Sequence, residues 1–385
     1  MRIETAEHLE AFRTELRAFI AQHSPGTKHH TGVRAPADDL VPAIRSFTAA
    51  LFDAGYLGAD WPEEHGGHGA AYDSREAFVV AEEIALARTW APIGAFQLAA
   101  PALIDFGTDE QRAHFLPRIR NAEDIWCQLF SEPGAGSDLA SLKTRARLAG
   151  DHWVIDGQKV WTTNGQRADV GYLLARTDLD APKHKGITAF ALDMRTPGVD
   201  VRPLREITGS SDFNEVFLDS VRIPVDRVIG EVNNGWRIAN SSLAHERSGV
   251  ASGSVELVAQ LQNLFELASG DAGEAARDRL GRLAVHVHVT DAMSKAVQSH
   301  MLAGTDDASD APLVKIFFSE TNLAMTELGI ELQGAGGIAA EGDADVAQDG
   351  WWQDAFLYAR AYTIAGGANE VLKNVVAERA LGMPR

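Results

Sequence analysis

Glu246 is the residue whose surroundings in the sequence most clearly suggest chemistry. Apolar residues flank it at spacings of three or four positions, at Trp236, Ala239, Leu243 and Val250. This spacing predicts that Glu246 lies on the apolar stripe of its own helix, where a carboxylate is costly unless it is paired or used. We therefore expect either an ion pair, with Arg247 or a more distant cation, or a general base in a water-poor pocket that raises its pKa towards working pH.

A second candidate is the loop at residues 131–138, which reads Ser-Glu-Pro-Gly-Ala-Gly-Ser-Asp. Its two glycines permit positive φ angles and close backbone approach, and the hydroxyls of Ser131 and Ser137 can form hydrogen bonds. Such a loop can hold the polar edge of a ring or a phosphate. A simple turn is the alternative, because glycine and serine are common turn residues.

A third candidate is the segment 159–165, which reads Lys-Val-Trp-Thr-Thr-Asn-Gly. In an extended chain, alternation places Trp161 and Thr163 on the same face. That face would offer a stacking surface and a hydrogen-bond donor to a flat heterocycle. The alternative is a core tryptophan beside a surface threonine.

Three stretches of the chain, which differ in their pattern of apolar residues, must position these candidate residues. Residues 1–125 show mainly helical spacing of apolar residues, for example at 40–57 and 74–87. Residues 126–232 contain short segments rich in β-branched and aromatic residues, closely punctuated by Gly, Pro and Asp, which predicts an antiparallel β lobe. Residues 233–385 return to helical spacing. The expected fold class is therefore α+β with several lobes: a helical N-terminal lobe, a central β lobe and a C-terminal helical lobe.

The composition excludes several functional classes. Asp and Glu outnumber Lys and Arg by 54 to 35, which disfavours binding to nucleic acid or to an anionic membrane surface. The single cysteine, Cys127, cannot form an intrachain disulfide and suits a reducing compartment. We find no signal peptide, no apolar stretch long enough for membrane insertion and no convincing metal-ligand spacing, so the expected location is cytoplasmic.

In this order and setting, the motifs resemble the acyl-CoA dehydrogenase family over nearly the whole chain. The matching segments are Trp-Pro-Glu-Glu-His-Gly-Gly at 61–67, the loop at 131–138, Trp-Thr-Thr-Asn-Gly at 161–165, Phe-Asn-Glu-Val-Phe-Leu-Asp at 213–219, Gln-Gly-Ala-Gly-Gly at 333–337 and Ile-Ala-Gly-Gly-Ala-Asn-Glu-Val at 364–371. The loop at 131–138 is the most specific of them.

The resemblance implies a C-terminal four-helix bundle and a bound FAD between the β lobe and this bundle, with an acyl-CoA thioester stacked on the isoalloxazine ring. By the family pattern, the isoalloxazine contacts are Ser131, Trp161 and Thr163, and Ser137 contacts the CoA portion. The other cofactor contacts are Gln333 and Gly337, which touch the dinucleotide of a neighbouring subunit, and Gly367.

The resemblance also implies a position for the catalytic base. In much of the family a carboxylate precedes the glycine of the closing motif, but here that position is Gly366. Some members that act on branched or bulky acyl groups carry instead a Glu immediately before an Arg, which matches Glu246 and Arg247. We therefore expect Glu246 to be the base, with Arg247 near the substrate. The backbone N–H of Gly366 can still donate to the thioester oxygen.

Two departures bear on the partners. The Arg-x-x-Phe-Gly segment that often contacts the FAD pyrophosphate across a subunit boundary is absent, and Ala368 stands where Thr is commoner. Together with the longer stretch 338–358, this resembles a branch that includes paired-subunit enzymes. We expect a homotetramer or a heterotetramer with a homologous subunit, and an electron-transferring flavoprotein as acceptor. The open alternatives are an acyl-CoA oxidase or flavin monooxygenase of the same superfamily, and a scaffold subunit that supplies half a flavin site.

Overall fold

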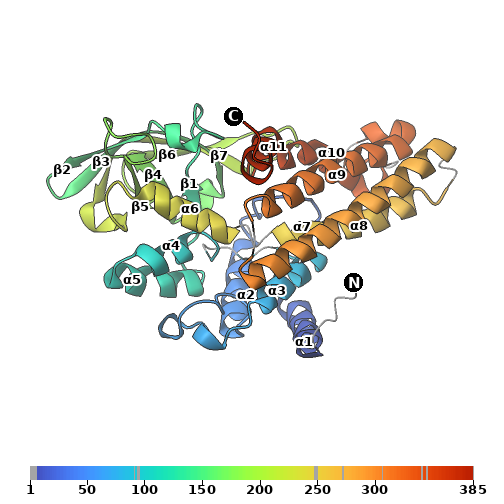
Figure 1. The fold of residues 1–385 in the computed structure, drawn as a ribbon, viewed down its shortest axis with the longest axis horizontal. Helices are drawn as coiled ribbons and strands as arrows, with labels where there is room; N and C mark the ends of the chain where they lie inside the picture. Colours follow the sequence, from blue (N-terminus) through green and yellow to red (C-terminus); the bar gives the residue numbers. More distant parts are fainter. Residues whose placement is uncertain are drawn as a thin grey trace. The chain divides into compact units, whose positions relative to one another are not determined.

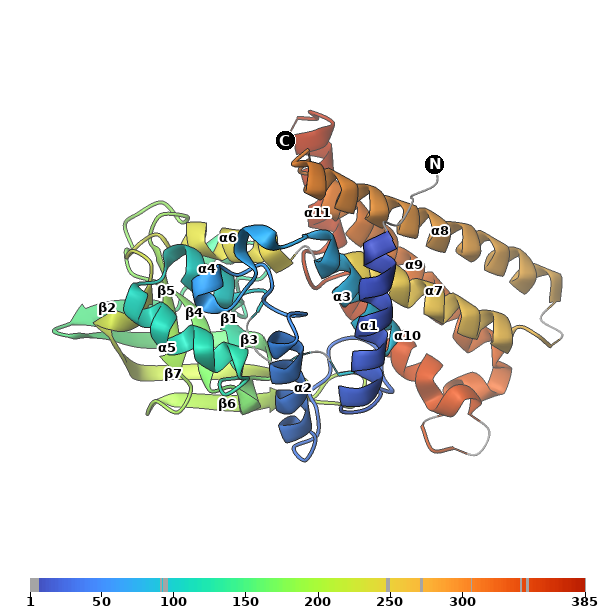
Figure 2. The same ribbon diagram turned by 90° about the horizontal axis from the view of Figure 1, so that it is seen from below.

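The computed structural model describes residues 7–90, 92, 96–246, 250–270, 273–305, 307–339, 341–343 and 346–384, and only the backbone of 244–246 and 250–252. The chain forms two compact units (Figures 1 and 2). Residues 33–72 and 91–246 make the sheet unit, and residues 1–32, 73–90 and 247–385 make the helical unit.

Eight strands form one sheet in the sheet unit. They are β1 (Trp126–Leu129), β2 (Arg145–Ala149), β3 (His152–Thr163), β4 (Val170–Arg176), β5 (Ile187–Asp193), β6 (Val199–Leu204), β7 (Phe213–Pro224) and β8 (Val228–Ile229). The strand order is β6-β7-β3-β2-β4-β5-β8, and β1 pairs with β4 in parallel. Most pairs are antiparallel, with the longest register between β3 and β7. The predicted antiparallel β lobe is confirmed.

Successive side chains along the strands of the sheet pack alternately into two hydrophobic cores. Tyr172 and Leu174 of β4 join one cluster with other strand and loop residues and with members of α2 (Val41–Asp53), α4 (Ala99–Phe106), α5 (Asp109–Arg120) and α6 (Gly235–Glu246). Leu173 of the same strand joins a second cluster with Phe190 of β5 and Val216 of β7. Because strands from both ends of the sheet order share this second core, the sheet curves around it.

The helical unit contains the predicted C-terminal bundle. Its four helices are α7 (Val250–Leu267), α8 (Gly273–Ala303), α9 (Asp310–Leu332) and α10 (Trp351–Tyr362), and their buried faces share one core. The ring of Trp352 lies where a Cβ on Gly329 would be, at 2.2 Å, so glycine is required for the close approach of α9 and α10. The short helix α11 (Asn369–Val375) packs on α9.

The N-terminal helices divide between the two units. Helices α1 (Glu7–His23) and α3 (Arg75–Leu86) belong to the helical unit, where α3 packs on α7. Arg13 and Arg17 of α1 both pair with Glu83 of α3, whose carboxylate is buried. Helices α2, α4 and α5 belong to the sheet unit. The lobe boundaries at residues 125 and 232 stay predictions. Within the described residues, no helix is long and apolar enough to cross a membrane.

Candidate functional site

The loop at 131–138 follows β1 and is closed by a tight turn. The Glu132 N–H donates to Ala135 O (3.1 Å) and the Ala135 N–H donates back to Glu132 O (3.0 Å). Ser131 is half-buried, and its carbonyl accepts the N–H of Val160 on β3 (3.0 Å). Ser137 is exposed. The structure therefore places both serines on one ordered loop, with Ser131 beside the segment that carries Trp161.

The two glycines of this loop leave space beside the backbone. Neither Gly134 nor Gly136 has a positive φ, so the turn itself does not require them. A Cβ at either position would meet no atom of the described residues within 4 Å. A ligand can therefore approach this backbone closely, as a flavin or nucleotide would need.

Lys159 on β3 holds the base of the loop. Its fully buried Nζ donates to Glu132 Oε1 (2.9 Å) and to Phe130 O (3.0 Å). The Glu132 carboxylate also accepts the N–H groups of Lys143 (2.6 Å) and Thr144 (2.9 Å). Burial lowers the pKa of Lys159 to about 8, so its amine is still protonated at neutral pH. Burial raises the pKa of Glu132, but Lys159 and the two N–H groups outweigh it and hold that pKa below its ordinary value.

The strand β3 is irregular at Trp161, which corrects one premise drawn from the sequence. The register with β7 shifts between Lys159 and Thr162, and Trp161 has a φ of 61°. Regular alternation therefore fails at this point, because a β-bulge re-aims the side chains. Thr162 is buried, Thr163 is half-buried, and Trp161 is 61% exposed with an edge contact to Phe213. The large exposed indole is available as a stacking surface.

The closing motif forms a loop between α10 and α11 that has two glycines in the left-handed region. Gly366 has a φ of 64° and Gly367 a φ of 98°. A Cβ on Gly366 would meet no atom of the described residues within 4 Å. Within the described part of the chain, the Gly366 N–H makes no backbone hydrogen bond. Among the described residues this N–H therefore has no backbone acceptor, and it can serve an acceptor on a ligand.

Lys315 of α9 anchors this loop, a role that we did not predict. Its Nζ donates to Gly367 O (2.6 Å) and to Asn369 Oδ1 (2.9 Å), and the buried Asn369 also bonds Ser319 one helical turn further along α9. Burial lowers the pKa of Lys315 to about 8, while Glu370 opposes this change. The spacing of Lys315 and Ser319, four residues apart on one helix, is the signal in the sequence that indicates a shared face.

The other predicted cofactor contacts lie at the opposite end of α9. Gln333 follows the helix, donates to Gly329 O (2.9 Å) and accepts from Gln353 of α10 (3.2 Å). Gly337 is buried, and a Cβ there would lie 2.6 Å from Ile330 O. About 18 residues separate Gln333 from Lys315, which corresponds to roughly 27 Å of helix at 1.5 Å per residue, and Gly337 lies beyond the helix end. The structure therefore does not bring Gln333 and Gly337 together with Gly366 and Gly367.

The predicted base lies at the end of α6. The apolar stripe is confirmed as far as the side chains are described, because Trp236, Ala239 and Leu243 all pack with the core of the sheet unit. The backbone of Glu246 continues this helix, but its side chain and the whole of Arg247 lie outside the described residues. Their predicted roles as base and substrate contact therefore stay predictions.

Three family models match the chain in consecutive segments. The N-terminal domain of acyl-CoA dehydrogenase matches residues 6–123, the middle domain 127–221 and the C-terminal domain 233–381. Among curated relatives, acyl-CoA dehydrogenase FadE34 of Mycobacterium tuberculosis is 42% identical over 96% of this chain, which spans about half (52%) of that protein. Acyl-CoA dehydrogenase IpdE1 of the same organism is 38% identical over 98% of this chain and 99% of its own length.

Two solved structures have the same fold over the whole chain. The Tcur3481-Tcur3483 steroid ACAD superposes with a TM-score of 0.89 at 30% identity, with 100% of both chains covered. The ChsE4-ChsE5 complex from Mycobacterium tuberculosis superposes with a TM-score of 0.82 at 27% identity, also with 100% of both chains covered.

Proposed function

Because the chain belongs to the acyl-CoA dehydrogenase family, we propose that it removes two hydrogens from an acyl-CoA thioester to give the 2,3-enoyl-CoA. The family is FAD-dependent, and bound FAD supplies the acceptor for the β-hydrogen as hydride. The observation that carries the proposal is the closing loop. Its Gly366 N–H makes no backbone hydrogen bond within the described residues, a Cβ at Gly366 would meet open space, and Lys315 fixes the loop at Gly367.

The proposed division of labour assigns proton transfer and charge stabilisation to different residues. Glu246 takes the α-proton, since Gly366 has no side chain to do so. The Gly366 N–H donates to the thioester oxygen, where negative charge develops as the α-proton leaves. Arg247 contacts the substrate beside the base. Gly366 also leaves space that a carboxylate side chain would fill.

The residues of the sheet unit fit a flavin. Trp161 offers an exposed indole face for stacking, and Ser131 and Thr163 offer hydroxyls to the polar edge of the ring system. The open space at Gly134 and Gly136 lets the loop backbone approach a ligand. Ser137 is exposed on the same loop, where we propose that it contacts the CoA portion.

The acyl group is proposed to be branched, long or bulky, in the range of a steroid-derived side chain. Two features support this: the absence of a side chain at Gly366, and the likeness to the Tcur3481-Tcur3483 steroid ACAD and to the ChsE4-ChsE5 complex. We propose that the electrons pass to an electron-transferring flavoprotein. The alternative is transfer to oxygen, as in an acyl-CoA oxidase or flavin monooxygenase, and rapid reoxidation of the reduced protein in air distinguishes it.

We propose a heterotetramer with a homologous subunit, in preference to a homotetramer. The chain lacks the Arg-x-x-Phe-Gly segment that often contacts the FAD pyrophosphate across a subunit boundary. We propose that the homologous subunit supplies this contact. Gln333 and Gly337, at the end of α9 opposite to the Lys315 anchor, suit contact with a second dinucleotide.

The experiment is an anaerobic titration of the purified, FAD-loaded chain with short, long and steroid-bearing acyl-CoAs, followed by flavin absorbance. Bleaching by the bulky class alone supports both the reaction and the substrate class. Bleaching by short straight-chain thioesters alone contradicts the substrate class. Failure to hold FAD, or retention of FAD without bleaching by any thioester, indicates that dehydrogenation needs the homologous subunit and favours the scaffold alternative.

A further inference from the structure

The segment that carries Trp161 and Thr163 has left-handed backbone at two non-glycine residues. Trp161 has a φ of 61° and Asn164 a φ of 55°. Between the register pairs at Lys159 and Thr162, β3 has one residue more than β7, which is the bulge described above. Non-glycine residues persist in this conformation only where the surrounding structure holds them. The contacts that hold this segment therefore decide how its side chains are presented.

The buried side chain of Asn214, on β7, makes the central contact. Asn214 is the register partner of Thr162 and is 0% exposed. Its Nδ2 donates to Thr162 O (3.0 Å) and to Gln166 Oε1 (2.5 Å). Because a carbonyl oxygen only accepts, the atom beside Thr162 O must be the amide nitrogen, and an apolar side chain cannot replace it. One side chain thus ties the residue after Trp161 to the turn that follows Asn164.

The packing around this contact leaves the segment little freedom to shift. A Cβ on Gly165 would lie 3.1 Å from Thr162 Cγ2, which is closer than ordinary van der Waals contact. On the other side of the bulge, the Val160 N–H donates to Ser131 O (3.0 Å). The segment is therefore held before Trp161 by the loop at 131–138 and after it by the side chain from β7.

The start of β7 is itself fixed, so it can serve as the support. Glu206 Oε1 accepts the N–H groups of Asp212 (2.7 Å) and Phe213 (3.1 Å). The Asp212 carboxylate pairs with Arg34 (3.1 Å), and both side chains are buried. The Phe213 ring contacts the Trp161 indole edge-on, with 6.1 Å between the ring centres. Three consecutive residues of β7 thus support the bulge.

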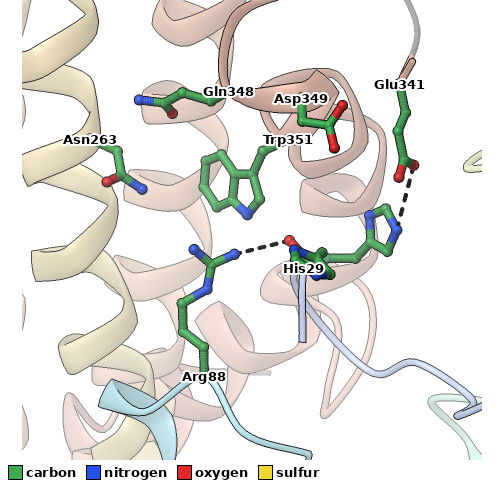
Figure 3. Close-up of a pocket in the computed structure, with 8 residues that line it drawn as sticks. His29, Arg88, Asn263, Glu341, Gln348, Asp349 and Trp351 are labelled. Atoms are coloured by element: carbon green, nitrogen blue, oxygen red, sulfur yellow. Dashed lines mark hydrogen bonds and ion pairs between the residues drawn. The ribbon is translucent and has the colours of Figure 1, made fainter. Parts of the chain in front are cut away.

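A second strained segment of the chain has a different setting. Gln348 and Asp349, in the helical unit, have φ angles of 50° and 53° and line a cavity of about 300 Å³ (Figure 3). The cavity is also lined by Arg88 and by Trp351, which is only 8% exposed. By contrast, Trp161 is 61% exposed, and it is the only aromatic residue among the non-glycine residues described in the left-handed region. The strain in β3 therefore coincides with a flat, accessible ring.

We propose that Asn214 is a positioning residue for the flavin. By holding the Thr162 carbonyl, its amide sets the direction of the Trp161 indole and of the Thr163 hydroxyl. The inference rests on the proposed function, in which these two side chains contact the isoalloxazine ring. Asn214 is fully buried, so it acts through its neighbours and not by contact with the cofactor.

The first measurement is a titration of the apoprotein with FAD. We expect Asn214→Ala to weaken FAD binding at least about fivefold, the range for one or two lost hydrogen bonds. In the background Trp161→Ala/Thr163→Val, the same change should weaken FAD less than about twofold, because the residues through which Asn214 acts no longer contact the flavin. Loss of the full fivefold in that background overturns the proposal, since Asn214 then acts by another route.

Asn322→Ala is the matched control for loss of a buried amide. Asn322 of α9 is 1% exposed, its Nδ2 donates to Gln260 Oε1 (3.0 Å), and its Oδ1, like that of Asn214, has no hydrogen-bond partner within the described residues. Its removal should destabilise the fold to a similar degree but leave the FAD affinity at the wild-type value. An equal loss of FAD affinity in both variants means that a general loss of stability is the cause, and it contradicts the positioning role.

The second measurement needs neither cofactor nor substrate. The eight tryptophans are labelled as 5-fluorotryptophan, and the ¹⁹F signal of Trp161 is the one lost in Trp161→Phe. In the apoprotein this signal should shift or broaden in Asn214→Ala and stay unchanged in Asn322→Ala. An unchanged Trp161 signal in Asn214→Ala overturns the proposal. This result decides the role of Asn214 even if FAD binding needs the homologous subunit, or if no thioester bleaches the flavin.

Discussion

Lys159 and Glu132 form a buried ion pair that ties the loop after β1 to the middle of β3, with Nζ 2.9 Å from Oε1. Every charged atom of the pair has hydrogen-bond partners, because Glu132 also accepts two backbone N–H groups and Lys159 also donates to a carbonyl. The loop is thus fixed without help from a ligand. A preorganised loop loses less conformational entropy when it binds one.

The first prediction concerns this pair. Lys159→Met leaves the Glu132 carboxylate buried without its cation, which we expect to cost about 3–5 kcal/mol of unfolding free energy. FAD should also bind more weakly, because Ser131 loses its fixed position. Urea unfolding and FAD titration of the apoprotein measure the two effects.

Lys183→Met is the matched control for this prediction. Lys183 pairs with Asp138 of the same loop at 2.8 Å, but both side chains are exposed. Its loss should change stability by no more than about 1 kcal/mol. A double variant with apolar residues at 132 and 159 should recover part of the stability but not the FAD affinity. If Lys159→Met keeps the stability and the FAD affinity of wild type, Lys159 does not position the loop at 131–138.

The second prediction is a pH dependence at the closing loop. The pKa of Lys315 is about 8 in the folded protein, against an ordinary value of 10.5. Between these values the unfolded chain holds more protons at this site than the folded chain, so the contribution of Lys315 to stability rises with pH. Below about pH 8 both states are protonated and the contribution is constant.

Urea unfolding of wild type and Lys315→Met between about pH 7 and pH 10 measures this. The stability of wild type relative to the variant should increase with pH above about 8. Lys373→Met removes an exposed pair with Glu320 between the same two helices and should show no such trend. If this relative stability stays constant or falls as the pH rises, burial does not lower the pKa of the Lys315 amine.

The third prediction separates two effects of adding a side chain at Gly366, which are strain in the backbone and loss of space for the acyl group of the substrate. Gly366→Ala and Gly304→Ala both place a Cβ at a φ of 64° where no described atom lies within 4 Å. Each should cost about 1–2 kcal/mol of stability. Only Gly366→Ala should slow flavin reduction by bulky acyl-CoAs, and it should affect short ones less. If the two variants react at equal rates with every thioester, Gly366 does not lie in the acyl site.

The fourth prediction tests the base. Glu246→Gln should keep FAD and its visible spectrum but lose substrate-dependent flavin reduction by at least about 100-fold, the low end for general base catalysis. Glu266→Gln, at an exposed position of α7, is the control and should react at the wild-type rate. If Glu246→Gln retains most of its rate, the base lies elsewhere.

Local sequence patterns were sufficient to predict the helices and strands, but they were less successful for the contacts between them. The β-branched segments around Leu173 and Phe190 are strands, and the apolar stripe through Trp236 and Leu243 is buried, since each depends on neighbours in sequence. The bulge at Trp161 was missed because it depends on pairing with β7, about fifty residues away. The Lys315 anchor was missed for the same reason, since its partner Gly367 is 52 positions distant.

The most direct test of the account is to identify the product. Wild type and Glu246→Gln, both loaded with FAD, are incubated anaerobically with a steroid-bearing acyl-CoA, and the thioester is analysed by mass spectrometry. The account predicts that wild type bleaches the flavin and yields one 2,3-enoyl-CoA, lighter by two hydrogens, for each flavin reduced, while the variant yields none. Flavin reduction without an enoyl product, or equal product from both proteins, contradicts it.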